Sequence, residues 1–155
     1  MNRKITLLAV SILLLTPSLS FASSGHCSTA TTAGAWDYTY TGTIFTASGP
    51  LPAASLGHYS QDSAGNVSGS QVRSVAGDSG VEDISATISV QRDCTASAVV
   101  EVHVNGQLER TANVAFVFDS DWNHMRAIFE SLTLPDGTNV PVVITIEGNK
   151  LFPKD

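Results

Sequence analysis

Residues 97–118 alternate between apolar and polar side chains on either side of Asn105-Gly106. A period of two places successive side chains on opposite faces of a β-strand. Asn-Gly tolerates the positive φ angles that a type I′ turn requires, so the segment predicts a β-hairpin. Arg110 and Ala112 fall on the same alternation as the apolar positions. The apolar face of this hairpin carries Val100, Val102, Val104, Leu108, Val114, Phe116 and Phe118.

Six further segments have the composition and alternation of strands. In the first of them, Trp36, Tyr38, Tyr40 and Ile44 share one face. The run Gly49-Pro50-Leu51-Pro52 is expected to end that strand, because proline cannot donate a hydrogen bond to a neighbouring strand. The third strand of the chain, at 67–76, is rich in serine and is a candidate edge strand. The six segments are 34–46, 54–63, 67–76, 82–92, 124–134 and 139–148.

Eight short strands without a helical period predict an all-β fold, either a sandwich or a closed barrel. Nearly every connection has the length of a hairpin turn. Short connections favour an eight-stranded antiparallel up-and-down β-barrel over a Greek-key arrangement. No linker or charge block divides the chain, so we expect one domain.

Residues 1–22 have the pattern of a signal peptide that is removed. Two basic residues precede the apolar run Ile5–Leu15, which is short for a membrane span, and Ser20 and Ala22 place small residues before the expected cleavage site. We expect a mature domain at 23–155, exported to the periplasm or the extracellular space. No second apolar run is long enough to cross a bilayer, so we expect no membrane anchor.

The charge and the motifs of the chain exclude several partners. The net charge is −6, and removal of the leader makes it more negative because the leader holds basic residues and no acidic ones. An acidic chain without a basic cluster is poorly suited to nucleic acid. The sequence has no phosphate-binding loop and no dinucleotide fingerprint, so we expect no cofactor. It does not indicate an oligomeric state.

The chain contains two cysteines, Cys27 and Cys94. An even number of cysteines in an exported chain favours a disulfide. The alternatives are a metal pair or a redox pair, and no Cys-x-x-Cys spacing supports either of them. We therefore predict a Cys27–Cys94 bridge that ties the start of the mature chain to its middle.

Several segments together resemble a group of small exported bacterial proteins of unassigned function. The resemblance implies a calycin-like barrel, similar in outline to allene oxide cyclase and the lipocalins. Gly34-Ala35-Trp36 matches part of the lipocalin Gly-x-Trp start, but the lipocalin Thr-Asp-Tyr signature has no counterpart, and no motif aligns a catalytic residue of allene oxide cyclase. The matching segments are Cys27, Gly34–Tyr40, the Gly-Pro break, Leu56–Tyr59, Gly65–Gly69, Val90–Thr95 and Arg126-x-Ile128-x-Glu130.

A barrel of eight strands is either filled by its own side chains or holds one small ligand. If the polar strand faces line the lumen, Glu101, His103, Arg126 and Glu130 form a charged ligand pocket. If those faces meet solvent, which charged residues favour, the four are ordinary surface groups. The aromatic face of the first strand, together with Tyr59, forms either core or the wall of a hydrophobic cavity.

Metal sites are not expected. Asp119, Asp121, Asn123 and Glu130 have the spacing of calcium ligands, but His124 replaces the glycine of a calcium loop, and the flanking segments read as strands. Aspartate and asparagine also form turns without a metal. The four histidines lack the close spacing of a zinc site.

The leading expectation for function is a non-enzymatic exported protein that binds a small apolar or amphipathic molecule in its barrel. The first alternative is an enzyme that works in the lumen, a cyclase or isomerase such as the resemblance to allene oxide cyclase implies. The second is a structural or protein-interaction module of the cell envelope that exposes an edge strand near 67–76.

Overall fold

The computed structural model describes residues 26–152, and every structural statement below refers to that part of the chain. The expected signal peptide lies outside the described residues. No helix in the described part is long and apolar enough to cross a membrane.

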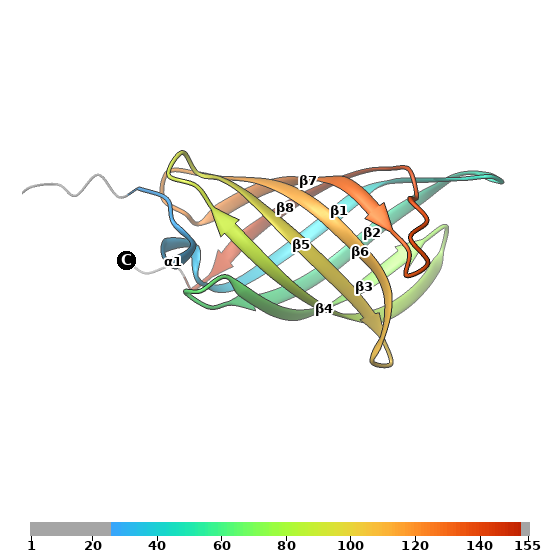
Figure 1. Ribbon diagram of the computed structural model, residues 1–155, viewed down its shortest axis with the longest axis horizontal. Coiled ribbons are helices and arrows are strands. Elements are labelled where there is room, and N and C mark those ends of the chain that lie inside the picture. Colours follow the sequence, from blue (N-terminus) through green and yellow to red (C-terminus); the bar gives the residue numbers. More distant parts are fainter. Residues whose placement is uncertain (1–25, 153–155) are drawn as a thin grey trace, which may run out of the picture.

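The strands form the closed antiparallel up-and-down barrel that the sequence predicts, and each strand pairs with its neighbours in chain order (Figure 1). The last strand pairs with the first, which closes the cylinder. Closure also pairs β3 on both sides, so the edge strand expected near 67–76 is wrong. The strands are β1 (Gly34–Thr46), β2 (Gly49–Gln61), β3 (Asn66–Val75), β4 (Asp78–Val90), β5 (Thr95–Val104), β6 (Gln107–Phe118), β7 (His124–Thr133) and β8 (Val142–Leu151).

Pro50 and Pro52 lie inside β2 rather than in a break before it, which corrects the expected boundary. The reason is the direction of their backbone groups. The Pro52 carbonyl accepts a hydrogen bond from Ala76 N, on the side of β2 that faces β3. In an antiparallel strand the nitrogen of a residue points to the same side as its carbonyl. The prolines therefore remove no donor from the ladder that joins β2 to β1.

The apolar strand faces point into the barrel. Trp36, Tyr38, Tyr40, Ile144 and Ile146 are all buried, as the alternation predicts. The outer face carries serine, threonine and charged residues together with exposed apolar side chains such as Leu56, Val72 and Val81.

The predicted turn at Asn105-Gly106 is present, with φ of 52° and 78° at its two residues. One position of this hairpin departs from the prediction. The register shifts so that Val102 opposes Arg110 while His103 opposes Leu108, which leaves Glu109 as a bulge. A bulge inverts the alternation beyond it. Leu108 is therefore exposed, and Arg110 keeps its place on the inner face.

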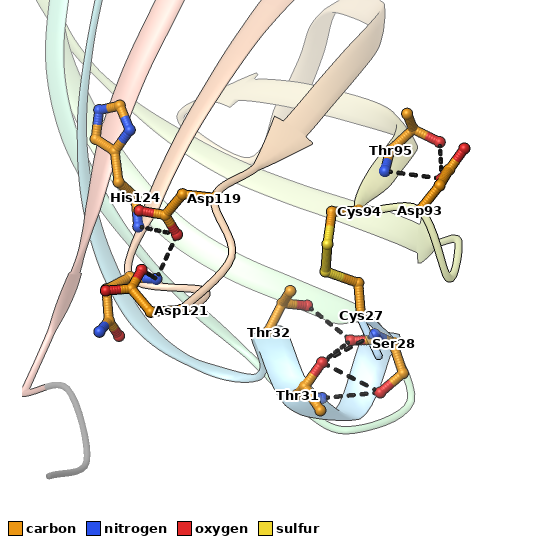
Figure 2. The surroundings of a disulfide bond; sticks show 11 residues. Cys27, Ser28, Thr31, Thr32, Asp93, Cys94, Thr95, Asp119, Asp121 and His124 are labelled. Atoms are coloured by element: carbon orange, nitrogen blue, oxygen red, sulfur yellow. Dashed lines mark hydrogen bonds between the residues drawn. A yellow bond between two sulfur atoms is a disulfide. The ribbon is translucent and has the colours of Figure 1, made fainter. Parts of the chain in front are cut away.

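One end of the barrel is covered by the short helix α1 (Thr29–Thr32), although the strand pattern predicted no helix (Figure 1). Ser28 caps this helix, since its side chain accepts from Thr31 N and its backbone N–H bonds the Thr31 hydroxyl. The predicted disulfide joins Cys27 to Cys94 and holds α1 against the turn after β4 (Figure 2). The opposite end carries the β1–β2, β3–β4 and β5–β6 turns.

Candidate functional site: a polar cluster in an apolar cavity

The barrel encloses a cavity of about 280 Å³. Its wall is mostly aliphatic and aromatic, with side chains from all eight strands. Trp36 closes it toward α1, where the indole Nε1 donates to the Thr32 carbonyl at 2.9 Å. Gln61 also bonds the helix, because its Nε2 donates to Thr29 O and to Thr32 Oγ1. Lys150 lies over the Trp36 ring at 5.8 Å from its centroid. The cavity is thus sealed at the end that the disulfide secures.

A charged cluster lies inside the barrel, nearer the other end. Glu82 is 2% exposed and is the centre of this cluster. Its Oε1 accepts from Arg73 Nε at 2.6 Å and from Arg110 Nη1 at 2.8 Å, while its Oε2 accepts from Arg110 Nη2 and from Gln71 Nε2 at 2.7 Å. The Arg110–Glu82 pair is therefore bidentate, because each of two guanidinium nitrogens donates to a different carboxylate oxygen.

Gln71 connects this cluster to the aromatic wall. Its Oε1 accepts from the Tyr38 hydroxyl at 2.8 Å and from the Ser55 hydroxyl at 3.0 Å. The Tyr38 ring reaches Gln71 over Gly57, which stands between them in the sheet. A Cβ at Gly57 would lie 2.6 Å from Tyr38 Cζ, so glycine is needed for this approach. The result is a continuous chain of hydrogen bonds from Tyr38 to Glu82.

The ionisation states of the cluster follow from these contacts. Burial raises the pKa of the Glu82 carboxyl, but hydrogen bonds from Arg110, Arg73 and Gln71 and the charge of Arg110 outweigh burial, so the pKa falls below its usual value. Burial raises the pKa of both Tyr38 and Tyr59 well above the ordinary phenol value. At neutral pH the site therefore holds one carboxylate, two guanidinium groups and neutral phenols.

Tyr59 is the one cavity-lining tyrosine whose buried hydroxyl has no hydrogen-bond partner within residues 26–152. Its ring stacks on Trp36, with centroids 6.3 Å apart and an interplanar angle of 12°. It also contacts Tyr38, with ring centroids 5.9 Å apart. The hydroxyl is therefore held in place on the cavity wall by the packing of its ring.

The residues that the sequence suggested for a charged lumen pocket lie elsewhere. Glu101, Arg126 and Glu130 are exposed and His103 is half-buried, all outside the lining of the cavity. Arg126 Nε is 3.9 Å from Glu147 Oε1 on the outer face, and both side chains are mostly exposed. The apolar strand faces point into the barrel, so these four residues do not form the charged lumen pocket, which required the polar faces to point inward.

The structure brings together Gln71, Arg73, Glu82 and Arg110 instead, none of which was predicted as a site residue. The sequence pattern does contain an indication of this cluster. Glu82 continues the alternation of Ile84, Ala86 and Ile88, and Arg110 continues that of Ala112 and Val114. A charged residue on an otherwise apolar strand face is the pattern that marks a buried polar cluster.

The carboxylates of the acidic turn at 119–123 bond the backbone of their own turn. Asp119 Oδ1 accepts from Asn123 N at 3.0 Å and from His124 N at 3.2 Å, so it orders the backbone of its own turn (Figure 2). The described residues contain no group of three histidine, cysteine or acidic side chains close enough to hold a metal ion. Asp121 Oδ1 also accepts from Asn123 N, two residues on, at 3.4 Å, which is the hydrogen bond of an Asx turn.

Comparisons with protein-family models, with curated proteins and with solved structures found no match to this chain. The function of this protein is therefore inferred from the cavity and its polar cluster alone.

Proposed function

We propose that this protein is an exported, calycin-like binding protein that holds a small apolar or amphipathic molecule inside its barrel. The observation that carries the proposal is the cavity of about 280 Å³ with an almost wholly apolar wall. A dry apolar cavity of about 150 Å³ is enough to bind benzene, so the space here admits a larger molecule.

The wall leaves this space because several inward positions carry small side chains. Ala86, Ala98 and Ala112 line the cavity from three adjacent strands, β4 to β6. Larger aliphatic residues at these positions would fill the lumen, as in barrels whose interior is a packed core. The sealed end and the disulfide support a rigid container, and a disulfide fits the oxidising compartment that the expected signal peptide leads to.

Proton-transfer catalysis is less well supported than binding. A general base needs a free carboxylate with a pKa near the working pH. Glu82 accepts four hydrogen bonds from three side chains, and its pKa lies below the usual value, so it is a weak base. A cyclase or isomerase acting in this lumen would have to work without proton abstraction by Glu82.

Native mass spectrometry of the protein purified from its own host tests the proposal, before and after mild denaturation. We expect a released molecule of one defined mass. The Ala98→Leu variant fills part of the cavity and should lose that molecule, and Ala86→Leu is a second variant if the first folds poorly. The control is Ala54→Leu, at an exposed position of β2.

A different result would overturn the proposal. If the protein carries only its polypeptide mass and gains none after incubation with a lipid extract of the host, the lumen is not a binding site. The outer row of Leu56, Val72 and Val81 would then be the next feature to test, because these three exposed side chains oppose one another on β2, β3 and β4.

A further inference from the structure

The charges inside the barrel do not balance. Within residues 26–152, Arg73 and Arg110 line the cavity, and Glu82 is the carboxylate that contacts them. Two guanidinium groups thus contact one carboxylate, which leaves one positive charge without a contacting carboxylate in a partly solvent-exposed site, and the Glu109 carboxylate acts on Arg110 through its charge alone. Arginine cannot relieve such a charge by losing its proton. An anion that enters the cavity would neutralise the surplus.

The hydrogen bonds show that Arg73 is the arginine with unused donor groups. A carboxylate offers about four acceptor sites, and Glu82 already receives four hydrogen bonds. Arg110 uses both of its Nη groups on Glu82, whereas Arg73 uses its Nε. The Nη groups of Arg73 have no acceptor among the described residues. Glu82 has no acceptor site left to offer them.

The position of Arg73 suits the entry of an anion. It lies three residues before the Ala76-Gly77 turn, at the end of the barrel opposite α1. Its side chain is 25% exposed, while that of Arg110 is 17% exposed, so both reach solvent from inside the barrel. A ligand can place its charged group at Arg73 and extend its apolar part toward Trp36.

The charge also indicates the kind of anion. One surplus positive charge matches a monoanion, and a phosphate monoester carries about −1.5 to −2 at neutral pH. A guanidinium presents two parallel N–H groups that match the two oxygens of a carboxylate. A carboxylate is therefore the better match to this site.

A second polar contact is available deeper in the cavity. The Tyr59 hydroxyl is buried without a partner among the described residues, and the Tyr59 ring rests against Trp36 near the sealed end. A buried donor without a partner is uncommon in native structures. A ligand oxygen at the far end of the apolar part would supply the acceptor.

We propose that the cavity takes an apolar monocarboxylic acid, with the carboxylate on Arg73 and a second oxygen at Tyr59. The inference rests on the proposed binding function and names its ligand class. If about 150 Å³ holds the six carbons of benzene, the cavity holds about 11 non-hydrogen atoms. The ligand is thus a medium-chain acid or a compact cyclic acid.

Isothermal titration calorimetry with four probes of equal atom count tests the ligand class. The probes are nonanoic acid, decanol, decylamine and ω-hydroxyoctanoic acid. We expect nonanoic acid to bind about tenfold more tightly than decanol, decylamine to bind most weakly, and the hydroxy acid to gain a further severalfold from Tyr59.

Variants separate the two contacts. Arg73→Gln should reduce the affinity for nonanoic acid to that for decanol, without changing the affinity for decanol, and Arg73→Lys should restore part of the preference. Tyr59→Phe should remove the advantage of the hydroxy acid alone. The control is Arg126→Gln, which removes an arginine from the outer face and should change no affinity.

The outcomes distinguish the two proposals. Equal binding of acid and alcohol, or tightest binding of the amine, overturns the ligand class and leaves the binding function standing. If none of the four probes binds, the binding function fails for ligands of this size, and the inference fails with it. Because the wild-type preference is itself decisive, the test does not depend on the folding of any variant.

Discussion

Replacement of Glu82 by glutamine is the most informative perturbation of this barrel. The change keeps the size of the side chain and removes the negative charge from between Arg73 and Arg110. The amide also places a donor where the arginines donate, so at least one guanidinium loses its partner. Breaking a buried ion pair on one side costs about 3–5 kcal/mol. The two arginine side chains are partly exposed, which favours the lower end, about 3 kcal/mol.

Urea unfolding followed by tryptophan fluorescence measures this loss. Trp36 is fully buried in the native state, so its emission reports the opening of the barrel. With a urea slope of about 2 kcal/mol per molar, the midpoint should fall by about 1.5 M. The matched control is Glu147→Gln, which removes a carboxylate from an exposed pair and should change the free energy of unfolding by less than about 0.5 kcal/mol.

A paired substitution tests the physical reason. Glu82→Leu with Arg110→Leu removes both members of the bidentate pair and leaves Arg73 as the one guanidinium of the cluster without its carboxylate, whereas Glu82→Gln leaves two. Replacing a buried ion pair by apolar residues is often neutral or stabilising. The double variant should therefore be more stable than Glu82→Gln, although it differs from the native chain at two positions.

The pH dependence provides a further check. The pKa of Glu82 in the folded protein lies below its ordinary value of 4.5. A lowered pKa means that the carboxylate stabilises the fold above the unfolded-state pKa, and that this contribution is lost as the pH falls through the folded-state pKa. The stability difference between the wild type and Glu82→Gln should be constant near neutral pH and narrow in acid. A Glu82→Gln protein as stable as the wild type at neutral pH would refute the reasoning, as would a double variant less stable than the single one.

Three other predictions follow from the structure. Replacing Cys27 and Cys94 together by serine should lower the free energy of unfolding by about 4 kcal/mol, because the bridge spans 67 residues, and a urea titration with and without reductant measures the loss. Gly57→Ala should cost about 1–3 kcal/mol, since its Cβ would meet the Tyr38 ring, whereas Gly80→Ala has open space and should be nearly neutral in the same assay. All three tyrosines have a pKa raised by burial, so phenolate absorbance should stay low past pH 10 and rise together with alkaline unfolding. The reason is that neutral phenols stabilise the fold below their unfolded-state pKa, and this contribution is lost as the pH rises. Titration of the tyrosines near pH 10 in the still-folded protein would contradict this prediction.

The strand pattern alone predicted the fold class, the number of strands and the Asn105-Gly106 turn. These features depend on local chemistry, namely the alternation of side chains and the φ angles that a turn residue tolerates. The disulfide was also predicted, from cysteine number and expected compartment. The proline boundary of β2 was not, because it depends on which side of the strand faces a partner.

The site was decided by the closure of the barrel. Arg73, Glu82 and Arg110 are charged residues on three separate strands, and nothing in their spacing along the chain shows that they meet. The Glu109 bulge makes the inward-facing residues harder to predict from alternation, because it moves Leu108 outward while Arg110 stays inside. Alternation assigns a residue to a face, but which residues oppose one another across the lumen depends on register and curvature. The strand pattern therefore predicted a barrel whose strands each have one apolar and one polar face. Closure of the barrel turned the apolar faces inward and placed two arginines and one carboxylate together among them.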